Sequence, residues 1–359
     1  MSEAVPVRIA GTGPIALACA LFLVRRGVPA ARIATDGRAG PLPQALAARA
    51  IALSQGSLQL LGRIASMPQG GRIGRVEVSV RGHAGRTRID AHDLGVPELG
   101  RVVRYGALLS ALEASAGAHR FRAAIDAGEP ALVVHADGDP GDCTDHLGFD
   151  QSALLLEVEA PQARADLRAT AFERFTAGGP LALLPLPEPA RWSVVWCDAP
   201  ASGEQRARAA PIALAAELQA QFGDALGPLT VDGARALVPL ARRARRTLAA
   251  DGQAWIGNAA QSLHPVAGQG LNLGVRDAFE LADALAQGLR RGLAPQQALQ
   301  AWSARRRTDR GLTIALTDLM AESFTWPLAR GLQSPLLTVL DAVPALRRPL
   351  ASQLTFGRR

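Results

Sequence analysis

The first hydrophobic segments of the chain predict a βαβ unit. Residues 5–10 form a short apolar run typical of a buried strand, and Gly11 to Gly13 predict a tight turn. Residues 14–26 are apolar, begin with proline and are followed by Gly27, as expected of a helix. Residues 31–35 then predict a second strand. The order strand, glycine turn, helix and strand is typical of an α/β domain.

The rest of the pattern predicts further helices and a strand-rich middle. Residues 45–61 carry apolar side chains at helical spacing, and so do residues 212–222 and the longer stretch 271–287. Short strands bounded by Pro and Gly are expected at residues 153–158, 171–175, 181–184 and 192–196. The sequence therefore predicts an α/β fold with an inserted, mostly β region and a helical C-terminal tail.

Basic residues are numerous, and all of them are arginine. The 359-residue chain has a formal charge of +7 and contains 39 Lys plus Arg, none of which is lysine. A genome that favours arginine codons explains this, and an anionic partner is the alternative. Two clusters, within residues 242–246 and 305–307, are each consistent with a solvated face. With one tyrosine and no alternation of aromatic and basic residues, we expect no nucleic-acid partner.

The reactive residue types exclude several chemistries. Without lysine, the chain has neither the usual P-loop nor a Schiff-base lysine. The three cysteines are irregularly spaced, which argues against a disulfide framework and favours a reduced, cytoplasmic protein. Cys143 and His146, with His135 upstream, lack a second ligand pair, so we predict no metal site.

The first motif that carries chemistry is a GxGxxA at the predicted turn. Gly11 permits the turn, Gly13 lets the backbone approach a pyrophosphate at the helix N-terminus, and Ala16 allows close helix–strand packing. Asp36 follows the second strand, where it can accept hydrogen bonds from a ribose. The motif predicts dinucleotide binding, and a glycine turn without a ligand is the alternative.

The second motif is longer and more specific. Residues 257–274 read GNAAQSLHPVAGQGLNLG and are followed by Arg276-Asp277-Ala278. A strand is expected to end at Gly257, where Asn258 can offer its amide to a hydroxyl-bearing ligand. A loop then leads into a helix whose free N–H groups and positive dipole end face an electron-rich group.

This stretch resembles the second FAD-binding motif of the class A aromatic-ring flavin monooxygenases. Its GNAAQ, LHP and AGQG elements resemble the ubiquinone-biosynthesis branch, the 2-polyprenyl-6-methoxyphenol hydroxylases. Residues 48–54, 101–112, 172–176, 179–185 and 194–197 resemble further segments of that branch. The resemblance thus runs from about residue 7 to residue 310. It departs from the family at residues 118–130 and 139–148, where the chain is shorter or different.

The resemblance implies FAD as cofactor and NADPH or NADH as co-substrate. It also implies that a flavin C4a-hydroperoxide formed with O2 hydroxylates the ring of a polyprenyl phenol. His264 and Pro265 are the candidate catalytic residues at the flavin face, with a loop histidine that only orders the turn as the alternative for His264. The implied cofactor-binding residues are Gly11, Gly13, Ala16, Asp36, Arg49, Arg104, Asp137, Gly138, Asn258, Gly268, Gly270, Leu271 and Asn272.

The same resemblance divides the chain into parts. Residues 1–70, 100–140 and 233–310 are expected to form a discontinuous, Rossmann-like FAD-binding domain, residues 71–99 and 141–232 a substrate domain, and residues 311–359 a helical segment. Apolar residues between 312 and 354 predict ordinary packing helices or, alternatively, a face for a membrane or a partner of a quinone-biosynthesis complex. The location is then cytoplasmic, with peripheral contact at the inner face of the membrane. Two rival functions stand: a flavin hydroxylase of another aromatic or isoprenoid substrate, and a non-catalytic accessory subunit.

Overall fold

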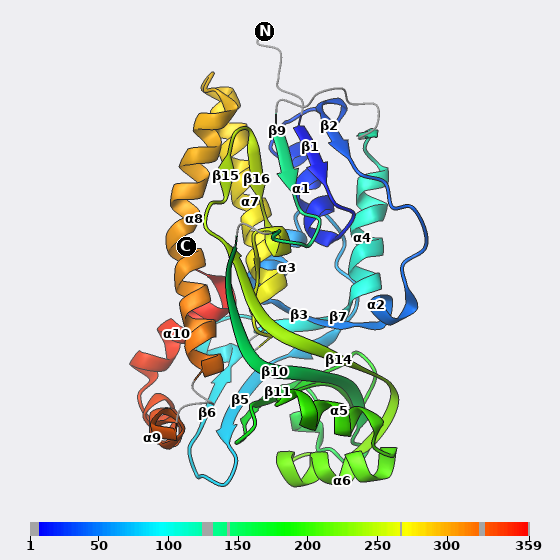
Figure 1. The fold of residues 1–359 in the computed structure, drawn as a ribbon, viewed down its shortest axis with the longest axis vertical. Coiled ribbons are helices and arrows are strands. Elements are labelled where there is room, and N and C mark those ends of the chain that lie inside the picture. Colours follow the sequence, from blue (N-terminus) through cyan, green and yellow to red (C-terminus); the bar gives the residue numbers. More distant parts are fainter. Residues whose placement is uncertain (1–6, 124–131, 142–143, 266–267, 323–326, 358–359) are drawn as a thin grey trace.

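This computed structural model describes residues 7–123, 132–141, 144–265, 268–322 and 327–357. Two large sheets lie one above the other with a small third sheet between them (Figure 1). A parallel sheet with helices forms the upper part in Figure 1, and a larger, mostly antiparallel sheet forms the lower part. The C-terminal helices run along one side of both parts.

The upper, six-stranded sheet is parallel except at one edge, where β15 pairs with β16 in antiparallel fashion. Its strands in spatial order are β15 (Ala249–Ala250), β16 (Gln253–Trp255), β9 (Leu132–His135), β1 (Val7–Ala10), β2 (Ile33–Thr35) and β8 (Arg122–Ala123). β1 lies between β9 and β2, so the turn after β1 opens at the carboxyl edge of the sheet. Ligands of doubly wound α/β sheets bind at this edge.

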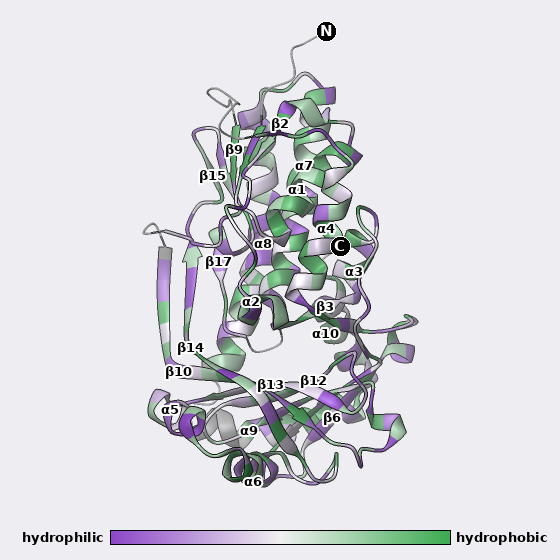
Figure 2. Cartoon of the chain, turned by 90° about the vertical axis from the view of Figure 1, so that its right-hand side faces the viewer, coloured by the Kyte–Doolittle hydropathy of each residue, from purple (hydrophilic) through white to green (hydrophobic). Residues whose placement is uncertain are grey.

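Apolar helices pack on this sheet and bury the main core. α1 (Pro14–Arg25) begins with proline at its first turn and contacts both α7 (Gln269–Arg290) and α4 (Tyr105–Gly117). α1 is largely green, and therefore hydrophobic, in Figure 2. Ile9, Leu23 and Leu281 are fully buried where these elements meet. The predicted βαβ unit is thus present.

A three-stranded antiparallel sheet lies between the two larger sheets (Figure 1), in the order β3 (Ala50–Ser54), β7 (Gly100–Arg104) and β4 (Gly71–Ile73). The helix predicted over residues 45–61 is therefore wrong in its middle. Only α2 (Gln44–Ala48) and α3 (Gln55–Leu61) are helical there. The strand between them forms because β7, distant in sequence, supplies its pairing partner.

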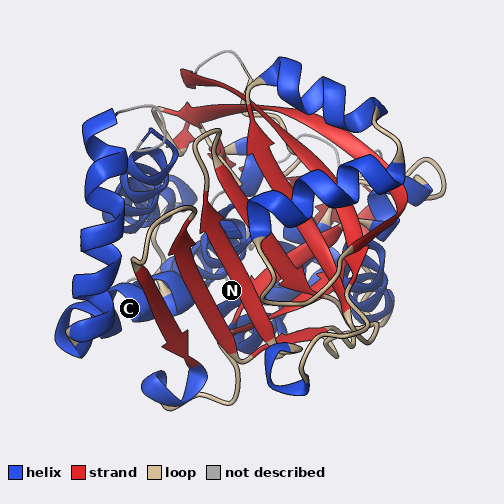
Figure 3. Ribbon diagram, turned by 90° about the horizontal axis from the view of Figure 1, so that it is seen from below, coloured by secondary structure: helices blue, strands red, loops and turns tan. Residues whose placement is uncertain are grey.

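The lower, eight-stranded sheet forms the floor of the molecule, and Figure 3 shows its strands side by side with helices lying across them. Its strands in spatial order are β17 (Gln261–Ser262), β14 (Thr230–Arg245), β10 (Thr144–Glu159), β13 (Arg191–Asp198), β12 (Pro180–Pro185), β11 (Thr170–Phe175), β5 (Arg75–Val80) and β6 (Arg86–Asp90). β14 carries this sheet to Arg245, and the division into domains that the resemblance implies stays a prediction.

The outer face of the lower sheet is covered by α5 (Pro200–Arg208) and α6 (Pro211–Phe222). Trp192, Trp196 and Phe172 are buried between this face and α6. The alternating residues of the same strands point the other way, toward the three-stranded sheet and α7. The inner face of the lower sheet is therefore the one that looks toward the predicted cofactor region.

Three helices make the C-terminal part: α8 (Pro295–Glu322), α9 (Pro327–Ala342) and α10 (Pro344–Phe356). α8 packs along α7, α9 lies against β5 and β6, and α10 returns to α3. Among the described helices, none combines the length and the apolar character needed to cross a bilayer.

Candidate functional site

The Gly11 turn has the geometry that the first motif predicts. Gly11 has φ +120°, and a Cβ at this position would lie 2.6 Å from the carbonyl oxygen of Ala136. Only glycine permits both the backbone conformation and this close approach. Gly13 is the N-cap of α1, and no described side chain caps that helix. Its first N–H groups are therefore available to an anion such as pyrophosphate, while Ala16 is buried beneath them.

Asp36 lies beside this turn. Its carboxylate accepts a hydrogen bond from the Gly11 N–H at 2.9 Å and pairs with Arg8 at 3.4 Å. The Arg8 side chain, which extends from within β1, thus helps to hold the acid at the end of β2. The Asp36 side chain keeps 28% of its exposure, so one edge of the carboxylate can still receive ribose hydroxyls.

Asp137 and Gly138 follow β9 and meet the same turn. The Asp137 N atom would lie 2.9 Å from a Cβ on Gly11, so the two loops are in contact. The Asp137 side chain is about half exposed, and Gly138 has φ +97° with open space where a Cβ would be. The structure therefore gathers Gly11, Asp36 and Asp137 at one edge of the parallel sheet.

The second motif packs directly onto the first. Gly257, with φ +58°, lies against Ile15 of α1, and Gly274 of α7 is so close that a Cβ there would lie 2.9 Å from the Gly257 Cα. Asn258, next in sequence, is exposed at this junction. The close packing of α1, Gly257 and α7 brings the two predicted halves of the cofactor site together.

The N-terminus of α7 is presented by a glycine and an asparagine. Gly268, the N-cap, has φ +59°, and within the described chain no side chain caps the helix. The buried Asn272 amide donates to the Gly268 and Ala52 carbonyls and accepts from the Ser54 N–H at 2.9 Å. Asn272 therefore fixes this helix end against β3. Gly270 in the first turn has open space where a Cβ would be.

His264 lies in the loop before α7 but points into protein. It is 1% exposed, its Nε2 lies 3.1 Å from Gln151 Oε1, and its ring packs edge-on against Phe149. Desolvation lowers the pKa of His264 to about 4. At neutral pH the imidazole is therefore uncharged and ties the loop to β10. Pro265 follows it and is only partly buried.

The two predicted arginines lie at the small sheet. Arg49 is exposed at the end of α2. Arg104 instead turns toward the lower sheet, where it pairs with Glu157 and with Glu188 at 3.1 Å, and hydrogen bonding to Glu157 raises the pKa of its guanidinium. A cofactor role for Arg49 and Arg104 stays a prediction, and Arg104 would have to serve it while bound to these carboxylates.

Sequence reasoning did not single out Tyr105, which the structure places at the Gly11–Gly13 turn. The Tyr105 hydroxyl would lie 3.4 Å from a Cβ on Gly13. Its backbone N–H donates to the Arg49 carbonyl, and burial raises the pKa of its phenol. The signal available in the sequence was that this is the single tyrosine of the chain, directly after Arg104.

A buried charge network supports the second motif from behind. Asp277 accepts from the Gly257 N–H at 3.2 Å and from Gln261 at 2.9 Å, and it receives the Nε of Arg306 at 2.9 Å. Arg306 also contacts Asp309 at 2.7 Å. The solvated face expected for residues 305–307 is therefore wrong for Arg306, whose side chain is 0% exposed.

The arginine cluster within residues 242–246 is likewise occupied within the fold. Arg242 pairs with Asp318, Arg243 with Asp139 and Arg246 with Asp145. Arg245 stacks 4.0 Å above the Trp255 ring. These arginines thus fasten β14 to its surroundings.

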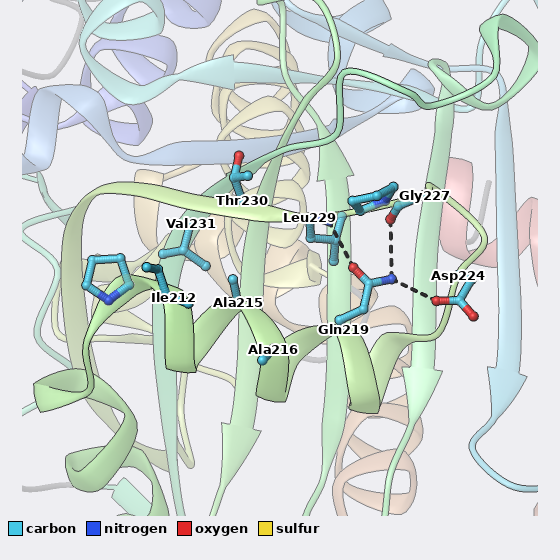
Figure 4. A pocket seen from close by; sticks show the side chains of 11 residues that line it. Ile212, Ala215, Ala216, Gln219, Asp224, Gly227, Leu229, Thr230 and Val231 are labelled. Carbon is cyan, nitrogen blue, oxygen red and sulfur yellow. Dashed lines mark hydrogen bonds between the residues drawn. The ribbon is translucent and has the colours of Figure 1, made fainter.

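Other candidate sites do not assemble. Among the described residues, no three or more His, Cys, Asp or Glu side chains could hold a metal ion, and Cys143 lies outside the described residues. An apolar groove of about 580 Å³ lies between α6 and the start of β14 (Figure 4). Gln219 closes one end of it by hydrogen bonding Asp224 and the backbone of Gly227 and Leu229. The groove is on the outer side of the lower sheet and contains none of the predicted site residues.

The family follows from comparison with known proteins. Residues 125–311, more than half of the chain, match the family model described as FAD binding domain. The chain belongs to this FAD-binding family. The matched stretch contains the second motif, whereas the Gly11 turn precedes it in sequence and joins it in space. Two helix N-termini that no described side chain caps, at α1 and α7, fit a dinucleotide, as do the exposed Asn258 and the open space beside Gly138 and Gly270. FAD is the cofactor.

Relatives and structures agree with the family. Ubiquinone hydroxylase UbiL of Rhodospirillum rubrum is 36% identical over 214 residues, which cover 55% of this chain and 47% of UbiL. The 3-demethoxyubiquinol 3-hydroxylase of Escherichia coli is 33% identical over 204 residues, 54% of this chain and 51% of that enzyme. The matches thus span about half the length of these relatives.

The crystal structure of p-nitrophenol 4-monooxygenase PnpA from Pseudomonas putida DLL-E4 superposes with a TM-score of 0.71 at 16% identity and covers all of both chains. The likeness shows that the whole chain has the fold of a flavin monooxygenase, as the sequence predicts. At this identity it carries no information on the substrate.

Proposed function

We propose that this protein is an FAD-dependent monooxygenase that hydroxylates the aromatic ring of a polyprenyl phenol in ubiquinone biosynthesis, with NADPH or NADH and O2 as co-substrates. The observation that carries the proposal is the N-terminus of α7, which no side chain of the described residues caps and which Asn272 fixes to β3 above the inner face of the lower sheet. The names of the two hydroxylase relatives support the substrate class.

Bound FAD would supply the redox and oxygen chemistry, taking a hydride from the nicotinamide and activating O2. The chain's residues hold and polarise it. The α1 N-terminus at Gly13 would bind the pyrophosphate, Asp36 the adenosine ribose, and Asn258 the ribityl chain. The α7 N-terminus would stabilise negative charge on the isoalloxazine, because its N–H groups and dipole are already oriented.

The loop before α7 would exclude water and fix the substrate side of the flavin. His264 is buried and neutral, so we assign it a positioning role: it binds Gln151 and keeps Pro265 in place. Pro265 would lie against the isoalloxazine, as the resemblance implies. No proton transfer needs to pass through His264.

The absorbance spectrum of the purified protein, before and after addition of FAD, tests the cofactor part of the proposal. We expect flavin bands that co-elute with the protein, and hydroxylated product from a prenylated phenol with NADPH. Replacing the exposed Asn258 with Leu should lower flavin occupancy without unfolding the protein. Gln162→Leu, an exposed amide on the outer side of the lower sheet, is the matched control. Unchanged occupancy in Asn258→Leu would remove Asn258 from the site.

A non-catalytic accessory subunit is the second candidate. The sequence feature that favours it is the short stretch of residues 118–130, which departs from the family pattern near where the adenine would lie. The same spectrum decides between the two. A colourless protein whose spectrum does not change when FAD is added would favour the accessory role. A protein that binds flavin but forms no product from prenylated phenols would indicate another aromatic or isoprenoid substrate.

We also propose peripheral contact with the membrane, since a polyprenyl phenol is a lipid. Leu332, Leu336 and Val339 are 66%, 58% and 46% exposed and lie on one face of α9. The opposite face, with Ser334 and Leu337, packs on the β5–β6 hairpin. Co-sedimentation with phosphatidylglycerol vesicles should be lost when the three exposed residues are changed to Ser. Equal co-sedimentation of the variant and the parent would refute contact through α9.

A further inference from the structure

Glu173 has a carboxyl oxygen that the fold shields from solvent but does not supply with a hydrogen-bond partner among the described residues. Its Oε1 atom is out of reach of solvent and has no hydrogen-bond partner among the described residues. The side chain as a whole is only partly buried, so it lines a wall and is not enclosed. Desolvation raises the pKa of Glu173 to about 7. Unsatisfied buried carboxyls are costly, and a functional ligand is a common reason to keep one.

The strand β11 aims Glu173 at the inner side of the lower sheet. Phe172 packs on the outer side against α6, so Ala171, Glu173 and Phe175 point inward. Ala171 belongs to a buried cluster that includes Ala52 of β3, and Phe175 packs against α9. Glu173 therefore lies between the small sheet and the C-terminal helices, facing the FAD-binding half.

The α7 N-terminus borders the same space through β3. The Ala52 carbonyl accepts a hydrogen bond from Asn272, and a Cβ on Gly268 would lie 3.7 Å from the Ala52 side chain. Ala52 therefore links the N-terminus of α7 to the cluster that contains Ala171, which lies two residues before Glu173 on the same side of β11.

The immediate neighbours of Glu173 are apolar. Its register partners are Ala182 on β12 and Val78 on β5. The Cys197 thiol is close enough to feel its charge, because the pKa of Cys197 is raised by burial and, to a lesser extent, by Glu173. A single carboxyl oxygen thus stands in an apolar surface, which suits an aromatic ring that carries one hydroxyl.

We propose that Glu173 binds the ring hydroxyl of the aromatic substrate and so selects phenols over rings that lack this group. The inference rests on the proposed function. The phenol O–H would donate to the Glu173 carboxylate, while the ring and its isoprenyl chain lie on the apolar residues around it. A site built to hydrogen-bond a hydroxyl rejects the analogue without it, because its own polar group is then left unpaired.

The test compares two probes, 2-prenylphenol and its methyl ether 2-prenylanisole. Binding is followed by tryptophan fluorescence of the FAD-loaded protein. We expect the wild type to bind the phenol roughly tenfold or more tighter than the ether, the size of one hydrogen bond to a charged group. Glu173→Leu should bind both alike. Glu173→Gln, which keeps an acceptor oxygen, should retain part of the preference for the phenol. It also provides a second test of Glu173 if the Leu variant does not fold.

The matched control is Glu77→Gln. Glu77 lies on the neighbouring strand β5, on the outer side of the sheet, where it pairs with Arg88. This variant should keep the full phenol preference. An equal phenol-to-ether ratio in the wild type and in both Glu173 variants, or no binding of the phenol by the wild type, would overturn the assignment.

Failure of the proposed function would look different. A wild type that binds the phenol through Glu173 but forms no hydroxylated product with NADPH would retain the Glu173 assignment and refute the monooxygenase. Conversely, a wild type that forms product, with unchanged phenol preference in Glu173→Leu, would retain the enzyme and refute the assignment.

Discussion

Replacing Arg306 with Met should destabilise the protein more than any exposed substitution. Arg306 is 0% exposed, and its guanidinium contacts Asp277 at 2.9 Å, Asp309 at 2.7 Å and Glu280 at 3.1 Å. Methionine fills much of the same space but provides no donor and no charge. Two buried carboxylates would lose the cation that they share.

The size of the stability loss depends on the partners that each carboxylate retains without Arg306. Asp309 is still paired with Arg276 at 3.2 Å. Asp277 keeps hydrogen bonds from the neutral donors Gly257 and Gln261, and a charge interaction without direct contact with Arg276 and Arg310. Breaking a buried pair by removing one partner costs about 3–5 kcal/mol. Because Asp309 retains one cation, we expect the free energy of unfolding to fall by about 4 kcal/mol. The free energy of unfolding of Arg306→Lys should lie between those of the wild type and Arg306→Met, because lysine keeps the charge but cannot bridge three carboxylates.

Urea denaturation of the purified proteins, with and without FAD, measures this loss. Arg164→Met, which removes an exposed ion pair with Asp166, is the control and should leave the midpoint unchanged. Arg306→Met should also weaken FAD binding, because Asp277 holds the Gly257 N–H next to Asn258. A loss of stability below about 1 kcal/mol would refute the view that this network supports the second motif.

Two further predictions concern the first motif and the flavin-face loop. Gly11→Ala should lower the free energy of unfolding by about 2–3 kcal/mol and abolish FAD binding, because φ +120° is strained for alanine and its Cβ would lie 2.6 Å from the Ala136 carbonyl oxygen. Thermal melting and flavin titration measure these effects, and a normal flavin titration would contradict the prediction. His264 has a lowered pKa, so its contribution to stability is complete above pH 6.5 and is lost as the pH falls toward 4, by up to about 3 kcal/mol. Thermal melts from pH 4 to 7.5 should therefore show a shallower acid decline for His264→Gln, and parallel curves would contradict a buried neutral histidine.

The buried charge network around Arg306 and the second motif depend on each other. The second motif pairs a rigid glycine with an acid: Gly257 approaches Ile15, and Asp277 holds the Gly257 N–H from behind. A substitution at either Gly257 or Asp277 should alter the position of the other, since both fix the loop that carries Asn258. Cofactor binding and stability are therefore expected to be coupled in this part of the chain.

The sequence by itself determined the elements whose signals are local. The βαβ unit, the Gly11 turn and the start of α7 near Leu271 were predictable, because hydrophobic period, Pro at a helix start and Gly at positive φ act over a few residues. The long specific motif at residues 257–274 also sufficed for the cofactor, because the spacing of its glycines and polar residues is that of a known family.

Only the tertiary structure decided the features that depend on distant partners. Residues 50–54 have helical spacing, yet they form β3 because β7 lies beside them. Arg306 resembles a surface residue in sequence, yet it is the centre of a buried network, because Asp277 and Asp309 converge on it from two helices. Glu173 is ordinary in a strand pattern and gains its meaning from the apolar wall that faces the FAD-binding half. Burial and charge pairing are set by contacts between remote segments, which no local pattern encodes.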